Sequence, residues 1–361
     1  MVRLPLDEMN PKQWIHYKRS EYGLGDSVPF KLNKQWLEGL LAKLPESERQ
    51  KARVVWEERD GQPIYDIYDD MMNYYVSQIA PIVLKEDQDI FENVNFGILP
   101  TCDFNGYAGF TRKGDRVIIL HEALGYTLNY WSHWYLRMLE EGDKFLIENP
   151  QRQDEILRHI VEIWNGYPLS DLMPDVHPIS MDAWELSETM TACAISFVLG
   201  HELGHVIKNH PPYGPNANEN HAMEYEADAI GLRFAIRYAI FGPGSQKDDT
   251  YFTKVCLIAP LFALCVMSLF GDRITLSHPS PSSRISNALN QYKELFKELF
   301  HDEAETVWNG IDSDLQSVLE TSSTRLFDIF SEYRKTIADL NMKPQNRGYR
   351  GFQKASGFRK S

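Results

Sequence analysis

The sequence has few cysteines, and none of them are spaced to hold a metal or to build a disulfide framework. Its four cysteines, Cys102, Cys193, Cys256 and Cys265, are scattered along 361 residues without a CxxC pair. Small secreted scaffolds are dense in disulfides, and cysteine-based zinc sites use closely spaced pairs. The sequence therefore excludes a disulfide-stapled scaffold and a cysteine zinc knuckle.

The N-terminus also lacks the pattern of a secretory signal. The first residues, MVRLPLDEMNPKQW, contain no apolar run behind a basic start, so we expect a cytoplasmic protein. An apolar run at residues 255–270, VCLIAPLFALCVMSLF, contains Pro260 and is shorter than the about 20 residues that span a bilayer. We expect this run to be a helix buried in the core and expect no membrane span.

Basic residues are outnumbered by acidic ones. The chain has 37 Lys and Arg against 51 Asp and Glu, a net charge of −14. Nucleic-acid binding depends on Lys and Arg that neutralise phosphates, so this imbalance argues against a nucleic-acid partner. The exception is the end of the chain, MKPQNRGYRGFQKASGFRKS, which has six basic residues and no acid. We expect residues 343–361 to be a disordered, solvated tail, with a nucleic-acid or anionic-surface contact as the alternative.

The composition, with 43% hydrophobic and 24% charged residues, is that of a globular protein. Apolar residues recur at helical spacing over most of the chain, whereas residues 91–121 are rich in β-formers around the turn TRKGD. We predict a mainly α (α+β) fold with a small β-hairpin or meander. The expected regions are a helical N-terminal region (1–90), a central domain (91–300), C-terminal helices (301–342) and the tail.

A helix predicted over residues 182–210 carries the sequence His201-Glu202-Leu203-Gly204-His205, an HExxH motif. Residues four apart lie on one face of a helix, so His201 and His205 can direct ring nitrogens at one ion, as zinc requires. Glu202 then lies beside the ion, where it can act as general base for a water molecule. The alternative is a buried helix with two hydrogen-bonded histidines.

A catalytic zinc needs a third protein ligand. The pattern HExxHxxGxxH is absent, because Lys208 and Pro211 replace its glycine and third histidine. On the next helix, predicted over 221–241, Glu224 and Asp228 share a face. Glu224 can therefore bind zinc while Asp228 accepts the outer N–H of a zinc-binding histidine, for which His201 is favoured. Three residues remain as alternative ligands: Glu219, His221 and Glu226.

These motifs together resemble the gluzincin metallopeptidases of the HtpX and CAAX-prenyl-protease type. HELGH is followed by ExxAD at Glu224–Asp228 and by HPxxxxRI at His278–Ile285, and residues 105–120 resemble the hairpin above that family's cleft. The resemblance covers about residues 95–290 and implies a zincin-like helical core with a small β-hairpin or sheet at the cleft. Residues 125–180 then look like an insertion, and the transmembrane helices common in the family are missing.

The resemblance also implies roles for further residues. His278, or a tyrosine, would donate a hydrogen bond to the oxyanion, which makes His278 a second catalytic residue beside Glu202. Arg284 would pack beneath the loop that carries His278 and fix it. A substrate peptide would add to an exposed edge strand through main-chain hydrogen bonds. That edge strand contains Asn105, Gly106, Tyr107 and Ala108.

Two other residues near these motifs are weaker candidates. His210 lies five residues after His205, which takes it off the ligand face of a continuous helix, so we expect it to interact with the negative end of the helix dipole. Cys102, close to the edge strand, could reach the zinc as a thiolate, but we favour an ordinary core or loop cysteine.

The sequence thus predicts a zinc-dependent peptidase, in the first place an endopeptidase, with one Zn²⁺ per chain and an intracellular protein or peptide as substrate. One alternative is a latent stress or phage-defence effector protease, whose chemistry would be the same. Another is a non-catalytic regulatory protein with a structural zinc site. The presence of Glu202 argues against that reading, because a structural zinc site has no use for a general base.

Overall fold

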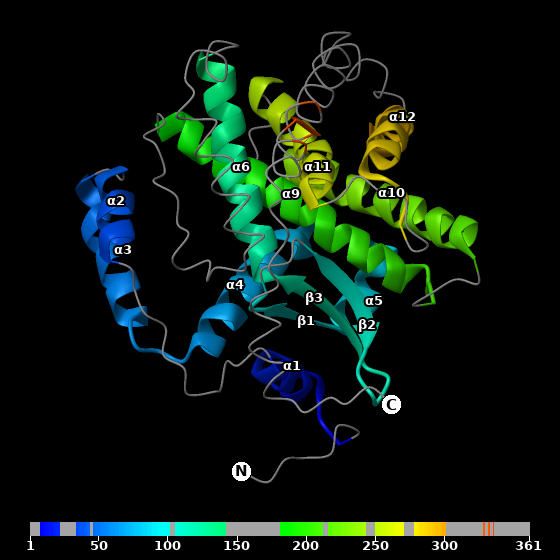
Figure 1. Cartoon of the computed structure of the whole chain (residues 1–361), viewed down its shortest axis with the longest axis horizontal. Coiled ribbons are helices and arrows are strands. Elements are labelled where there is room, and N and C mark those ends of the chain that lie inside the picture. Colours follow the sequence, from blue (N-terminus) through cyan, green and yellow to red (C-terminus); the bar gives the residue numbers. More distant parts are fainter. Residues whose placement is uncertain are drawn as a thin grey trace.

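The computed structural model describes residues 8–21, 34–43, 46–101, 105–141, 181–211, 216–242, 250–270, 278–300, 328, 331, 332 and 335. It is mainly helical with a small three-stranded sheet, as the sequence predicted (Figure 1). The elements are α1 (Pro11–Glu21), α2 (Lys34–Lys43), α3 (Glu46–Arg59), α4 (Ile64–Ile79), η1 (Ala80–Ile82), η2 (Lys85–Asp87), α5 (Gln88–Glu92), β1 (Val94–Leu99), β2 (Gly106–Phe110), β3 (Arg116–His121), α6 (Glu122–Glu141), α9 (Met181–Ile207), α10 (Ala217–Phe241), α11 (Thr250–Phe270) and α12 (Pro281–Phe300).

The sheet has the strand order β1-β3-β2, with β1 parallel and β2 antiparallel to β3. The predicted hairpin is therefore β2–β3, but a meander through all three strands is wrong, because β3 and not β2 lies in the centre. The physical reason is the apolar run Val117–Leu120, which is buried on both faces of the sheet. The partly exposed GYAGF of β2 stays at the edge.

The two faces of β3 belong to different clusters of buried side chains. Val117 and Ile119 pack with Trp14 and Ile15 of α1. Their neighbours Ile118 and Leu120 face the main core, to which α9, α10 and α11 contribute most of the buried residues. Helix α9 contacts α6, α10 and α11, and it also contacts β2. The helix that carries HELGH is thus held between the sheet and the helical core.

Helices α9 and α10 approach closely at a glycine contact. A Cβ atom added to Gly231 of α10 would lie 2.6 Å from the carbonyl oxygen of Phe197 and 3.1 Å from the backbone nitrogen of His201. Gly200 on α9 likewise faces α10, where a Cβ would lie 2.7 Å from Cβ of Phe234. Side chains at these positions would separate the two helices, so the glycines allow α10 to lie directly against the HELGH motif.

The apolar run at residues 255–270 belongs to α11, and residues 256–266 of this helix are buried in the core despite the internal Pro260. Among the described residues, one helix is long and apolar enough to cross a membrane, Leu186–Ile207 within α9. Its apolar window is 89% buried inside the protein, as in the core helix of a soluble protein. This burial is compatible with a soluble protein.

Several helix ends differ from the predicted ones. Helix α9 ends at Ile207, three residues before the predicted end, and α10 begins at Ala217 because the side chain of Asn216 caps it, accepting a hydrogen bond of 3.0 Å from the Glu219 N–H. Residues 142–180, nearly all of 301–342 and the tail 343–361 lie outside the described residues. The predicted domain boundaries and the insertion at 125–180 stay predictions.

Candidate metal centre and active site

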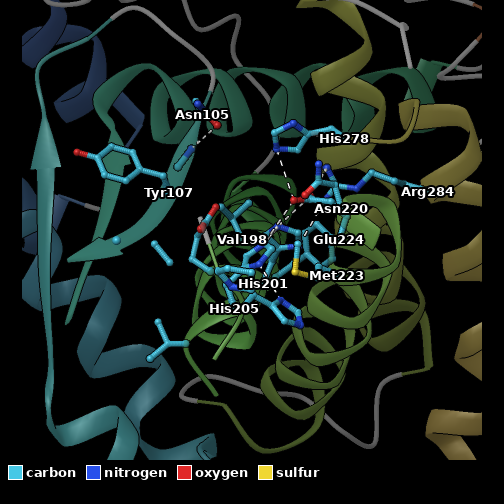
Figure 2. Close-up of a pocket in the computed structure, with 18 of the residues that line it drawn as sticks. Asn105, Tyr107, Val198, His201, His205, Asn220, Met223, Glu224, His278 and Arg284 are labelled. Atoms are coloured by element: carbon cyan, nitrogen blue, oxygen red, sulfur yellow. Dashed lines mark hydrogen bonds and ion pairs between the residues drawn. The ribbon is translucent and has the colours of Figure 1, made fainter. Parts of the chain in front are cut away.

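Three side chains from two helices converge in a cavity of about 420 Å³ between β2, α9, α10 and the start of α12 (Figure 2). His201 and His205 come from α9 and Glu224 comes from α10, and one ligand atom of each lies within 4.8 Å of the others. The two Nε2 atoms are 3.2 Å apart. Each of them lies 3.5 Å from a carboxylate oxygen of Glu224.

These separations fit a tetrahedral metal site. Nitrogen or oxygen ligands at about 2.0–2.1 Å from a zinc ion lie about 3.3–3.4 Å from one another at tetrahedral angles. In addition, Oε2 of Glu224 is buried and has no hydrogen-bond partner among the described residues. Buried polar atoms are nearly always paired, so this oxygen calls for a further partner in the cavity. His201, His205 and Glu224 could therefore bind a metal ion.

The hydrogen bond at the outer nitrogen of His201 and the neutral form of His205 suit both rings for binding a metal through Nε2. Nδ1 of His201 lies 2.9 Å from Oδ1 of Asp228, a carboxylate that accepts the Nδ1–H and leaves Nε2 free. Asp228 raises the pKa of His201 against the effect of burial. Burial and the neighbouring histidines lower the pKa of His205 to about 2. His205 is thus a neutral imidazole at pH 7, which is the form that binds metals.

Asp228 also forms an ion pair with Arg284, which lies in the first turn of α12. Ser280 caps this helix by accepting a hydrogen bond of 3.2 Å from the Ser283 N–H, and Pro281 occupies the first helical position. The buried guanidinium of Arg284 donates two hydrogen bonds to Asp228, one of 2.8 Å to Oδ2 and one of 2.5 Å to Oδ1. Burial by itself would raise the pKa of Asp228, but Arg284 and His201 outweigh it and hold the pKa at about 2.

Glu202 lies in the same cavity, between the histidines and strand β2. Its carboxylate accepts a hydrogen bond from the backbone N–H of Ala108. It also lies so close to Gly106 that a Cβ there would be 3.4 Å from Oε1 of Glu202. Burial, with a contribution from the charge of Glu224, raises the pKa of Glu202 to about 7. A carboxyl group with this pKa can both accept and release a proton near neutral pH.

This raised pKa makes the stability of the metal-free protein depend on pH. Below pH 4.5, the unfolded value, Glu202 is protonated in both states and costs nothing. Between pH 4.5 and 7 only the folded state keeps the proton, so the free energy of unfolding falls as the pH rises. Above pH 7 burial of the ionised Glu202 carboxylate costs the folded state about 3 kcal/mol, at about 1.4 kcal/mol per pKa unit. Glu202→Gln should therefore be more stable than the wild type at pH 8 and equal to it near pH 4.5. Urea denaturation of both metal-free proteins across this range measures the difference, and a difference that does not change with pH would contradict the assignment.

Among the described residues, no strand pairs with the outer edge of β2, and this edge faces the cavity. The Asn105 carbonyl accepts from the His121 N–H at 3.0 Å, and the Thr111 N–H donates to the Asp115 carbonyl at 2.9 Å. In an antiparallel pair, every second residue of a strand hydrogen-bonds to its neighbour, and in β2 this set includes Asn105 and Thr111. The backbone groups of the residues between them, Gly106 and Ala108, therefore point away from β3, toward the cavity. Asn105, Gly106, Tyr107 and Ala108 all line the cavity, but the ring of Tyr107 points away from the metal ligands (Figure 2).

His278 lies at the rim of the cavity, just before α12. Its Nε2 is 3.5 Å from Oε1 of Glu224, and its side chain is 54% exposed. The resemblance implies His278 or an unspecified tyrosine as the oxyanion donor. The ring of Tyr107, a tyrosine that lines the cavity, is directed elsewhere, so His278 is the better placed of these two residues. Cys102, considered as a metal-blocking thiolate, lies outside the described residues.

Two residues near His205 have a larger part in the site than the sequence predicted. His210 contacts the outer nitrogen of His205, Nδ1 to Nδ1, at 3.0 Å, and Nε2 of His210 lies 3.1 Å from Oε2 of Glu226. The prediction that His210 falls off the ligand face assumed a continuous helix, whereas α9 ends at Ile207 and Asn209 has a positive φ of 53°. An asparagine shortly after HExxH, here Asn209, is a sequence signal for such a helix end.

Comparisons with known proteins agree with a peptidase. The family model described as Peptidase U49 matches residues 166–302, which include every described residue of the site on α9, α10 and α12 and His278. Neither the curated proteins nor the solved structures contain a match to the chain. The narrower resemblance to the HtpX and CAAX-prenyl-protease type rests on the sequence motifs alone. The matched family supports the conclusion that this chain is a peptidase.

Proposed function

We propose that the protein is a zinc-dependent endopeptidase that hydrolyses peptide bonds of an intracellular, cytoplasmic protein, with Glu202 as its general base. The observation that carries the proposal is the convergence of His201, His205 and Glu224 beside the buried carboxyl of Glu202, in a cavity open to a strand edge. Two histidines and a carboxylate suit zinc among the divalent ions. A structural zinc site would need neither Glu202 nor the cavity.

Zinc at these ligands would supply Lewis-acid chemistry, polarising a carbonyl group and making a water molecule more acidic. The residues of the chain perform the other steps. Glu202 accepts the proton of the attacking water, because its carboxylate lies beside the metal ligands in the same cavity, and then delivers this proton to the leaving amine. His278, at the rim beside Glu224, donates a hydrogen bond to the oxyanion.

Strand β2 would hold the substrate in this reaction. An extended peptide can pair with the outward backbone groups of Gly106 and with the carbonyl group of Ala108, next to Glu202, which takes the Ala108 N–H. The cavity also has an apolar lining that would receive the substrate's side chains, formed by Leu124, Phe197, Val198, Val206, Met223 and Met267. We therefore expect a substrate with apolar residues next to the cleaved bond.

The metal site is tested by elemental analysis of the purified protein after dialysis against buffered zinc. We expect about one zinc per chain in the wild type and a loss of zinc in Glu224→Ala, because two histidines alone do not complete a zinc site. The matched control is Glu219→Ala, since Glu219 is an exposed acid on the same helix whose carboxylate accepts from Asn216 instead. Its zinc content should equal that of the wild type.

Two results would contradict the proposal. If the wild-type protein contains no zinc after this treatment, HELGH is not a metal site, and the alternative of a buried helix with two hydrogen-bonded histidines holds. Equal zinc contents in the wild type and Glu224→Ala would show that Glu224 is no ligand. Folding of each variant is checked by circular dichroism, so that a loss of zinc cannot be attributed to a loss of structure.

A further inference from the structure

We propose that His210 and Glu226 form a hydrogen-bond chain that orients His205 and strengthens metal binding at this ligand. This inference rests on the proposed metal site and assigns positioning roles to two residues outside it. Nδ1 of His210 lies 3.0 Å from Nδ1 of His205, and Nε2 of His210 lies 3.1 Å from Oε2 of Glu226. His205 therefore has an outer partner, as His201 has in Asp228.

The end of helix α9 builds this contact. The His210 N–H donates to the His205 carbonyl at 2.9 Å, and the Asn209 N–H donates to the Val206 carbonyl at 3.1 Å. With Asn209 at a φ of 53°, these two bonds form a Schellman motif, in which the chain reverses after the last turn. The motif places the side chain of His210 against the side chain of His205. This contact is usually apolar, but here it joins two imidazole rings.

Metal binding by His205 determines which nitrogen carries the proton on each ring of the hydrogen-bond chain. When Nε2 of His205 binds a metal, the neutral ring carries its proton on Nδ1 and donates it to Nδ1 of His210. His210 then carries its own proton on Nε2 and donates it to the carboxylate of Glu226. Each donor thus meets an acceptor, and the carboxylate of Glu226 ends the hydrogen-bond chain.

His210 and Glu226 differ in burial, and we expect the more buried residue to contribute more to zinc affinity. The side chain of His210 is 7% exposed, whereas that of Glu226 is 57% exposed. A buried hydrogen bond to a ligand contributes more than an exposed one that water can replace. We therefore expect His210 to matter more for the orientation of His205, with Glu226 fixing the tautomer of His210 from the surface.

The test measures the affinity of the metal-free protein for zinc in competition with a chromophoric chelator. His210→Ala should bind zinc about 10–100-fold more weakly than the wild type, as is typical when the outer partner of a metal ligand is removed. Glu226→Ala should cause a smaller loss. The double variant should bind no more weakly than His210→Ala, because Glu226 acts through His210 and the two effects are not additive.

Two further variants separate a hydrogen bond from a general effect on the helix end. In His210→Asn the side-chain oxygen takes the place of Nδ1 and can accept from His205, so this variant should recover much of the lost affinity. The control is Lys208→Ala, an exposed residue two positions away on the same helix end, which should bind zinc like the wild type.

Three outcomes would overturn the inference while leaving the metal site intact. These are an unchanged zinc affinity in His210→Ala, equal losses in His210→Ala and His210→Asn, and an equal loss in Lys208→Ala. Failure of the wild type to bind zinc would instead contradict the proposed function, so the two failures are distinguishable. Thermal unfolding of the metal-free variants reports any loss of folding separately from metal affinity.

Discussion

Glu202→Gln is expected to reduce peptide hydrolysis by about 10²–10⁴-fold while the protein keeps its zinc. The glutamine side chain has the same shape, and its carbonyl oxygen can still accept from the Ala108 N–H that now binds Glu202. It cannot take up a proton, so the general base is lost without a change in the ligands. The measurement compares cleavage rates of the two zinc-loaded proteins on a proteome-derived peptide library, with new peptide ends identified by mass spectrometry.

The zinc content of Glu202→Gln must equal that of the wild type for this comparison to report on the base alone. Glu219→Gln serves as the control for loss of an acid, and it should cleave at the wild-type rate. Hydrolysis by Glu202→Gln within about tenfold of the wild-type rate would show that another group takes the proton. The same library would reveal whether cleaved peptides carry apolar residues next to the cleaved bond, as the cavity lining predicts.

Much of the candidate site lies within reach of sequence reasoning, because it depends on spacing within single helices. Residues four apart share a helix face, and the structure places His201, His205 and Glu224 around one point and Asp228 beside His201. The fold class was predicted for a related reason, since helical periodicity and the β-rich segment are local patterns.

The remaining features depend on contacts between distant segments or on the ends of elements. Arg284 meets Asp228 from another helix, a pairing for which the sequence spacing gives no rule. His210 reaches His205 only because α9 stops and Asn209 turns the chain, and helix ends are the least certain part of a periodicity argument. Strand β3 lies in the centre of the sheet because both of its faces are buried. The sequence does not show this, because one of the faces is covered by α1, which is distant in the sequence.

The pairing of Arg284 with Asp228 leads to the largest expected effect on stability. Arg284→Met should destabilise the metal-free protein by about 3–5 kcal/mol at pH 7, because it leaves the Asp228 carboxylate buried without its cation. The sign with pH follows from the pKa of Asp228, which is about 2 when folded against 3.8 otherwise. The stabilisation by Arg284 is therefore complete above pH 3.8 and is lost as the pH falls toward 2.

Urea denaturation at pH 7 measures this loss, and two comparisons identify its cause. Lys297→Ala removes an exposed ion pair with Glu294 on the same helix, so it should cost less than about 1 kcal/mol. Arg284→Met combined with Asp228→Leu removes both buried charges and should be more stable than Arg284→Met alone, because no carboxylate is left uncompensated. If Arg284→Met costs no more than Lys297→Ala, then Asp228 finds another partner, and the orientation of His201 does not depend on α12. If the double variant is the least stable, packing rather than charge holds α12 against the site.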